Sequence, residues 1–232
     1  MSPARGIAID GPAGSGKSTL ARRLAEALGV PYVNTGLMYR AVTLEALRKR
    51  LDLDDGPALG ALARRMRFDL NSKVVPGVLL VEGKPPPPEI ASAEVELHVS
   101  RVSAHPEVRA VLRAEQRRLG EGGAVMEGRD IGTVVFPDAA VKVFLLAEPA
   151  ERAARRIRER AEAGGAPEAP GVAEALAARD EQDARVNPLL PAADAVPVET
   201  TGKDADAVFR EAFSLVEERL PEGPGGRPGE GS

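Results

Sequence analysis

The chain has 232 residues, of which 43% are hydrophobic and 28% charged, close to the average of soluble globular domains, so its composition excludes global disorder. A net charge of −4 and an aromatic content of 3% argue against a protein that holds nucleic acid or an anionic membrane by a basic surface, or that stacks single-stranded bases on aromatic rings. The absence of cysteine excludes disulfides, thiolate catalysis and cysteine-ligated zinc. With no apolar stretch of about 18 residues, we expect a cytoplasmic protein with no membrane partner.

The first part of the chain alternates between strand and helix patterns. Residues 6–10 are a short apolar run followed by glycine, which is typical of a buried strand. Residues 16–29 carry leucines at helical spacing and end in Gly29, a common helix stop. A second strand at 30–33 and a second helix at 36–50 follow. This order predicts a parallel sheet.

The middle of the chain changes character. Residues 67–70 and 78–81 have the pattern of short strands, and we interpret residues 51–90 as a small β-rich insertion. A long helical pattern covers 91–119, with Pro106 as a predicted break because proline lacks a backbone donor. At about 150 residues per domain, the chain length fits one core with an insertion.

The last part of the chain returns to strand and helix patterns. Residues 141–146 are almost entirely apolar, as expected for a strand covered on both faces. Residues 221–232 contain little besides glycine, proline and charge, which predicts a disordered tail. In chain order, the other predicted elements are a strand at 124–126, helices at 149–163 and 172–184, a strand at 196–198 and a helix at 204–219.

A phosphate-binding motif joins the first strand to the first helix. It matches G-x-x-x-x-G-K-S, and in such a loop the backbone N–H groups and the helix N-terminus face an anion. The motif predicts a nucleoside triphosphate ligand, with Lys17 reaching its β- and γ-phosphates and Ser18 ligating Mg²⁺. Thr19 has two interpretations, phosphate contact or helix packing. The predicted nucleotide-binding residues are Gly11, Pro12, Ala13, Gly14, Ser15, Gly16, Lys17, Ser18 and Thr19.

The motif does not by itself define a reaction. A GTPase needs [NT]-K-x-D to read guanine, and the nearest string, at 202–206, has glycine where asparagine or threonine should stand. A small protein with this loop and an insertion after its second helix suggests a kinase for a small molecule. Two alternatives stay open: a kinase for adenylate, uridylate or shikimate, and a regulatory or nucleic-acid-linked ATPase without a small-molecule acceptor.

Two further motifs carry a family resemblance. The sequences N-T-G-L-M-Y-R at 34–40 and E-G-R-D-I-G-T-V-V-F-P-D at 127–138 resemble bacterial cytidylate kinases, which are nucleoside monophosphate kinases. The resemblance implies an α/β fold of the P-loop NTPase type, a five-stranded parallel sheet flanked by helices, with a small β-rich acceptor-binding insertion and a helical lid. The implied division is a core at 1–33 and 101–220, an insertion at 34–100 and a lid at about 150–185.

The resemblance also implies a reaction and its partners. ATP donates its γ-phosphate to CMP or dCMP, with Mg²⁺ and without a covalent intermediate, through positioning and charge neutralisation. We expect these small molecules as the only partners, with no nucleic acid, and a monomer because no apolar heptad pattern is present. The implied catalytic residues are Lys17, Arg129 and Arg179.

The same resemblance assigns the acceptor site. Arg40 and Arg129 grip the acceptor phosphate through their guanidinium forks, Asp130 accepts the N4 amino group of cytosine, and Ser100 and Arg109 contact the base. From the residues alone, Arg40 could instead cap a helix, and Arg129 and Asp130 could form a buried ion pair. The implied substrate-binding residues are Thr35, Arg40, Ser100, Arg109, Arg129, Asp130, Asp183 and Arg185.

Arginines recur every four residues on one face of the helix predicted at 149–163. This pattern fits either a solvated surface or a lid that closes over ATP, in which Arg156 contacts the nucleotide. By resemblance, Arg179 faces the phosphates, Asp183 the ribose hydroxyls and Arg185 the acceptor side. The segment that follows Asp183 is shorter than the family pattern.

Overall fold

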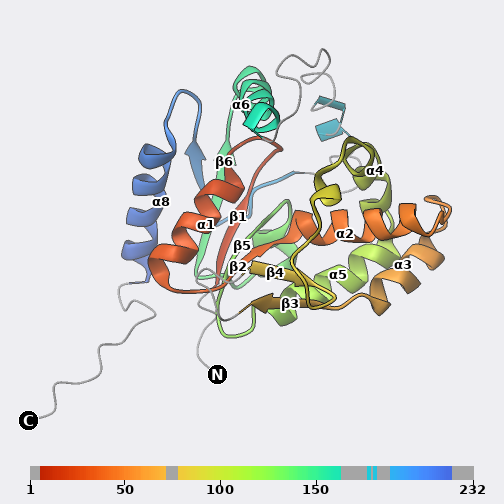
Figure 1. The fold of residues 1–232 in the computed structure, drawn as a ribbon. Helices are drawn as coiled ribbons and strands as arrows, with labels where there is room; N and C mark the ends of the chain where they lie inside the picture. Colours follow the sequence, from red (N-terminus) through yellow and green to blue (C-terminus); the bar gives the residue numbers. More distant parts are fainter. Residues whose placement is uncertain (1–5, 72–77, 163–176, 179, 182–188, 221–232) are drawn as a thin grey trace, which may run out of the picture.

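A parallel sheet of five strands forms the centre of the molecule (Figure 1). The computed structural model describes residues 6–71, 78–162, 177–178, 180–181 and 189–220. The strand order is β2-β5-β1-β6-β7, with every neighbouring pair parallel, which confirms the predicted fold class. The strands are β1 (Ile7–Asp10), β2 (Tyr32–Asn34), β5 (Val125–Gly128), β6 (Val141–Leu146) and β7 (Val196–Glu199).

The strand register brings the three sequence motifs to one edge of the sheet. Asp10, the last residue of β1, pairs with Gly128 of β5, and Asn34 of β2 pairs with Glu127. The carboxyl ends of these three strands are therefore level, and each is followed by one of the motifs. Open parallel sheets bind ligands just beyond this edge.

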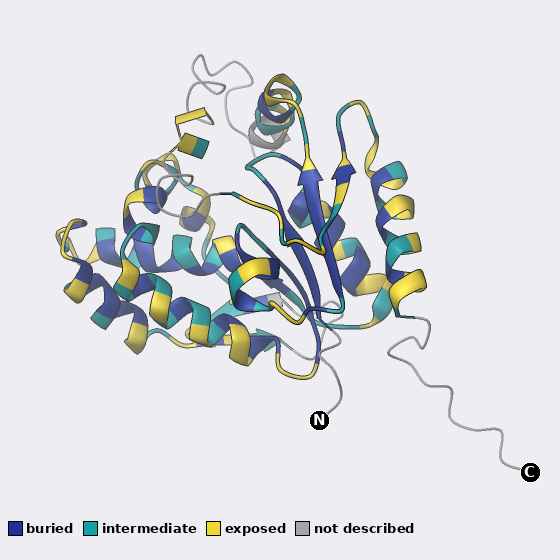
Figure 2. Cartoon of the chain, turned by 180° about the vertical axis from the view of Figure 1, so that it is seen from behind, coloured by how far each residue is buried: buried dark blue, intermediate teal, exposed yellow. Residues whose placement is uncertain are grey.

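Alternate residues of β1 pack into two hydrophobic clusters, because successive side chains of a strand point to opposite faces. Ile7 and Ile9 join a cluster with α1 (Lys17–Leu28) and α8 (Ala205–Arg219), and Ala8 joins the cluster on the opposite face. Figure 2 shows buried residues on the strands and on the inward sides of the helices, with exposed residues outside. Helices thus cover the sheet on both faces, which explains its nearly unbroken apolar strands.

The insertion contains helices as well as the predicted strand pair. Strands β3 (Phe68–Asn71) and β4 (Val78–Val81) lie close to the two strands predicted at 67–70 and 78–81, and they pair in antiparallel orientation. Helix α3 (Gly56–Arg65) is absent from the predicted elements. The Asp55 side chain caps it by accepting a backbone hydrogen bond, and Pro57 stands in its first turn. These residues therefore begin a helix, although their types also suit a turn.

The predicted break at Pro106 is confirmed. Helix α4 (Ala93–Ser103) ends before it, and helix α5 (Pro106–Leu119) begins with it, at the first helical position, where a missing N–H costs nothing. Helix α2 (Thr35–Arg48) packs directly against α4. The 3-10 turn Pro88–Ala91 contacts both of these helices.

Helix α6 (Pro149–Glu162) stands beyond the carboxyl edge of the sheet (Figure 1). Most of the helix predicted at 172–184 and the tail predicted at 221–232 lie outside the described residues. Among the residues that the structure describes, no helix is long and apolar enough to cross a membrane.

Candidate active site

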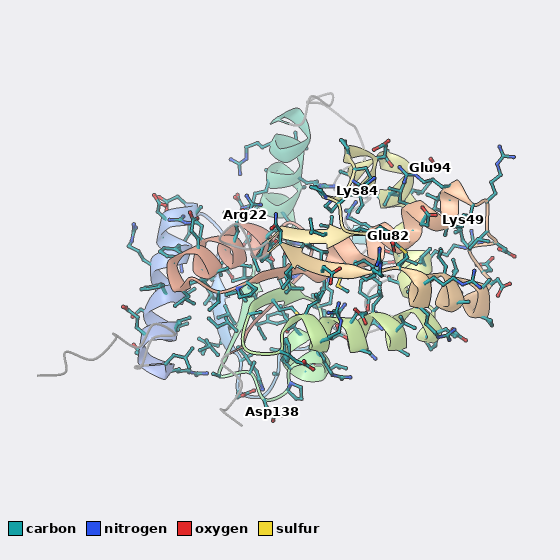
Figure 3. All side chains as sticks on the ribbon, turned by 60° about the horizontal axis from the view of Figure 1, so that its bottom comes forward. Arg22, Lys49, Glu82, Lys84, Glu94 and Asp138 are labelled. Atoms are coloured by element: carbon teal, nitrogen blue, oxygen red, sulfur yellow. The ribbon has the colours of Figure 1, made fainter. Side chains whose placement is uncertain are left out.

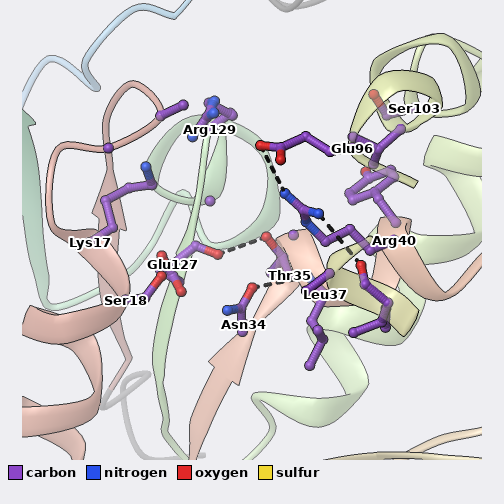
Figure 4. A pocket seen from close by; sticks show the side chains of 18 of the residues that line it. Lys17, Ser18, Asn34, Thr35, Leu37, Arg40, Glu96, Ser103, Glu127 and Arg129 are labelled. Carbon is purple, nitrogen blue, oxygen red and sulfur yellow. Dashed lines mark hydrogen bonds and ion pairs between the residues drawn. The ribbon is translucent and has the colours of Figure 1, made fainter. Parts of the chain in front are cut away.

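A cavity of about 370 Å³ lies at the carboxyl edge of the sheet (Figure 4). Its walls come from the phosphate-binding loop, α2, α4, α6 and the loop after β5, so it joins all three sequence motifs. Ligand sites in proteins are concave and carry a few convergent polar groups. The polar lining includes Lys17, Ser18, Thr35, Arg40, Glu96, Arg109, Glu127, Arg129, Asp130 and Arg156.

The phosphate-binding loop has the backbone conformation that its glycines predict. Gly14 and Gly16 have φ angles of 72° and 92°, in the left-handed region that favours glycine. A Cβ on Gly14 would lie 2.9 Å from the carbonyl oxygen of Arg152, so no larger residue fits where α6 crosses the loop. Gly16 is the N-cap of α1, and the helix therefore presents its unsatisfied N–H groups at the cavity.

Lys17 is held across its own loop. Its Nζ donates a hydrogen bond to the carbonyl oxygen of Pro12 at 2.6 Å, and the residue is 8% exposed, so the charge lies beside the cavity. Ser18 and Thr19 follow at the start of α1 and also line the cavity. Thr19 is exposed, so its side chain is not packed into the core.

Glu127 begins the third sequence motif, but the sequence analysis gave it no role in the site. It lines the cavity as a buried carboxylate and accepts a hydrogen bond from the Tyr32 hydroxyl at 2.6 Å. Burial raises the pKa of Tyr32 far above its ordinary value, and the neighbouring Glu127 charge raises it further. The phenol therefore stays protonated and keeps Glu127 in place. Its position near the carboxyl end of β5, the strand beside β1, could have identified it as a site residue.

Thr35 is fixed between β5 and α2. Its Oγ1 donates to the backbone carbonyl of Glu127 at 2.7 Å, and the Asn34 side chain caps α2 by accepting from the N–H of Leu37 at 3.0 Å. A Cβ on Gly128 would lie 2.7 Å from Thr35 Oγ1. The glycine of the third motif thus permits this close contact.

Two of the arginines predicted to bind the nucleotides, Arg40 and Arg156, contact the same carboxylate, that of Glu96. Arg40 Nη2 lies 3.9 Å from Glu96 Oε1, and Arg156 Nη2 donates to the same oxygen at 2.6 Å. Arg40 Nη1 also contacts the carbonyl oxygen of Ile90 at 3.5 Å. Glu96 was not predicted as a site residue, because it lies on α4 outside all three sequence motifs.

Arg129 and Asp130 have separate partners. Arg129 Nη1 donates to the carbonyl oxygen of Gly11 at 2.9 Å, which brings its guanidinium to the phosphate-binding loop. Asp130 Oδ2 accepts hydrogen bonds from Arg109 at 2.8 Å and from Arg113 at 2.6 Å. Arg113 is a partner that sequence reasoning missed, although it lies one helical turn after Arg109.

Asp10 holds the loop that carries these two residues. Its carboxylate oxygens accept backbone hydrogen bonds from Ile131 at 2.9 Å and Gly132 at 2.7 Å. Burial raises the pKa of Asp10, and the same two hydrogen bonds oppose that shift. The end of β1 thereby fixes the residues that follow Asp130.

The first turns of α6 are bound to the phosphate-binding loop. Arg152 donates to the carbonyl oxygen of Ala13 at 3.2 Å and forms an ion pair with Asp180. Arg155 donates to the carbonyl oxygen of Ser15 at 3.3 Å and to Thr200 Oγ1 at 2.9 Å. These contacts place the beginning of the predicted lid, which spans about 150–185, against the core, with Arg156 lining the cavity.

A family model described as cytidylate kinase matches residues 7–218. The chain belongs to the cytidylate kinase family. A cytidylate kinase of Exiguobacterium sibiricum is 44% identical over 217 residues, which cover 92% of this chain and 97% of that protein. A second, of Shouchella clausii, is 44% identical over 91% of this chain and 96% of its own length. Among solved structures, a gluconokinase of Sinorhizobium meliloti shares the fold with a TM-score of 0.50, 16% identity and 94% coverage of each chain.

The fold brings most of the predicted cytidylate kinase residues together. Among the predicted acceptor residues, Ser100 is buried on α4, whereas Ser103, one turn later, lines the cavity. Gly11, Pro12 and Ser15 of the phosphate-binding loop are described but do not line the cavity. The predicted residues Arg179, Asp183 and Arg185 lie outside the described residues. Those that line the cavity are Ala13, Gly14, Gly16, Lys17, Ser18, Thr19, Thr35, Arg40, Arg109, Arg129, Asp130 and Arg156.

Proposed function

We propose that the chain is a cytidylate kinase that transfers the γ-phosphoryl group of ATP to CMP or dCMP, giving ADP and CDP or dCDP. One observation carries this proposal. A single cavity has the phosphate-binding loop with Lys17 on one side and the Arg109–Asp130 pair on another. A nucleotide donor and a base-bearing acceptor can therefore face each other across it.

The donor side suits the triphosphate of ATP with Mg²⁺. Backbone N–H groups at the start of α1 and the Lys17 ammonium would bind the β- and γ-phosphates. The Ser18 hydroxyl and the Glu127 carboxylate line the same cavity, and oxygen ligands of this kind suit Mg²⁺. No group of three or more acidic or histidine side chains among the described residues could hold a metal alone, so Mg²⁺ would be held together with substrate phosphates. When bound, Mg²⁺ neutralises phosphate charge during the transfer.

The acceptor side suits a cytosine nucleotide. The two arginines use Oδ2 of Asp130, so Oδ1 is the oxygen that would accept the cytosine N4 amino group. Arg109 would donate to the O2 and N3 acceptors of the base, and Arg40 and Arg129 would bind the phosphate. That phosphate is already an anion near neutral pH, and its attack on the γ-phosphorus needs positioning and charge neutralisation instead of a strong general base.

The test is ADP production from Mg-ATP with CMP, dCMP, UMP, AMP, GMP or no acceptor. We expect fast turnover with CMP and dCMP, slower turnover with UMP, and little without an acceptor. A preference for AMP or GMP would contradict the base assignments of Arg109 and Asp130. Equal loss of ATP with and without acceptors would instead indicate an ATPase.

A further inference from the structure

Glu96 is a carboxylate in the lining of a cavity whose proposed ligands are negatively charged nucleotides. It projects from α4 toward Arg40 (Figure 4), and the exposed fractions of the Arg40, Glu96 and Arg156 side chains are 16%, 17% and 23%. Arg40 comes from α2, on the acceptor side of the cavity, and Arg156 comes from α6, beside the phosphate-binding loop. Glu96 therefore joins the two halves of the cavity.

Glu96 differs from the other acidic residues of the cavity in its partners. Among the described residues that line it, five are basic and three are acidic. Glu127 accepts a hydrogen bond from Tyr32, and Asp130 is bonded to two arginines on α5. Glu96 contacts Arg40, which is assigned to the acceptor phosphate, and Arg156, which is assigned to the nucleotide.

A guanidinium can bind either a carboxylate or a phosphate, because each anion offers a pair of negatively charged oxygens that accept two parallel hydrogen bonds. The contact between Arg40 and Glu96, at 3.9 Å, is Coulombic and too long for a hydrogen bond. A phosphate monoester brings three oxygens and more negative charge than a carboxylate, so it competes well for Arg40.

We propose that Glu96 is a specificity-determining residue: before substrate binds, it is the counter-ion of Arg40 and Arg156 and occupies space beside Arg40 that the acceptor phosphate takes, and that phosphate displaces it from Arg40. The inference rests on the proposed function for the identity of the acceptor. Glu96 thereby lowers the affinity of the cavity for phosphate anions that lack the binding contribution of a correct base. It supplies the arginines with a counter-charge while the cavity is empty of nucleotide.

The test compares Glu96→Gln with Glu94→Gln. The first substitution keeps the shape of the side chain and one oxygen for Arg156 but removes the charge. Glu94 lies in the same first turn of α4 and is exposed (Figure 3), so its substitution removes an equal charge outside the cavity. We expect Glu96→Gln to lower KM for CMP roughly three- to tenfold at low salt, with kcat within about twofold. Glu94→Gln should leave both constants unchanged.

Inorganic phosphate provides a readout that does not depend on turnover. Calorimetric titration should show that Glu96→Gln binds phosphate more tightly than the wild type by a similar factor. A higher KM for CMP in Glu96→Gln would overturn the proposal, because it would mean that Glu96 stays beside the arginines in the complex and orients them. Equal effects of the two substitutions would also overturn it.

The two proposals can fail separately. If CMP is not an acceptor but Glu96→Gln still binds phosphate more tightly than the wild type, the proposed function fails and the role of Glu96 stands. If CMP turnover is normal and the two proteins bind phosphate equally, the role of Glu96 alone fails.

Discussion

The substitution Asp130→Asn separates base recognition from nucleotide binding. It keeps the size and shape of the side chain but removes its charge, while Arg109 and Arg113 stay in contact. The new amide can donate hydrogen bonds, whereas the carboxylate only accepts them. Cytosine presents an amino donor at position 4, and uracil presents a carbonyl acceptor there. We therefore expect the variant to lose CMP turnover and to lose its preference for CMP over UMP.

The structure sets the size of both effects. A hydrogen bond to a charged group contributes about 1.5–3 kcal/mol, so kcat/KM for CMP should fall about 10- to 100-fold. The arginine side chains are 13% and 26% exposed, and their pairing with a neutral amide should cost about 2 kcal/mol of stability. For a chain of this length, that cost lowers Tm by about 4–8 °C.

The assay is steady-state kinetics with CMP, UMP and ATP below the Tm of the variant. KM for ATP should change by less than about threefold, because Asp130 is assigned to the acceptor. Asp138→Asn is the matched control, since Asp138 belongs to the same motif but is exposed (Figure 3). Equal losses for ATP and CMP, or an unchanged ratio of CMP to UMP, would refute base recognition and make Asp130 a structural residue.

Three further substitutions test the donor side. Lys17→Ala should abolish phosphoryl transfer and leave the fold intact, as judged by circular dichroism, because the Lys17 contact lies within its own loop; near-normal turnover would contradict the role. Gly14→Ala should weaken ATP binding roughly tenfold in a calorimetric titration. Position 14 has a left-handed φ, and a Cβ there would lie too close to the Arg152 backbone, so the substitution should distort the loop. Unchanged affinity would mean that the loop adapts. Tyr32→Phe should reduce the free energy of unfolding by about 1–3 kcal/mol in urea titrations, because the buried Glu127 loses its donor; unchanged stability would show that another donor replaces the phenol.

Local patterns determined much of the fold. Strand β6 has the predicted bounds Val141–Leu146, because a nearly apolar run of this length is too short for a buried helix and fits a strand covered on both faces. The phosphate-binding loop was predictable because its glycine positions reflect backbone angles within a few residues. Helix α3 was missed because Asp55 and Pro57 suit both a turn and a helix start, and its packing against α5 decides between them.

The pairing of charges depended on the tertiary structure. Glu96 and Arg156 are 60 residues apart, and Tyr32 and Glu127 are 95 apart, so no sequence spacing links them. The sequence by itself determined which local segments bind phosphate, because those motifs act through their own backbone. The tertiary structure decided which arginine meets which carboxylate, because that choice follows from how the sheet register and the crossing helices bring distant side chains together.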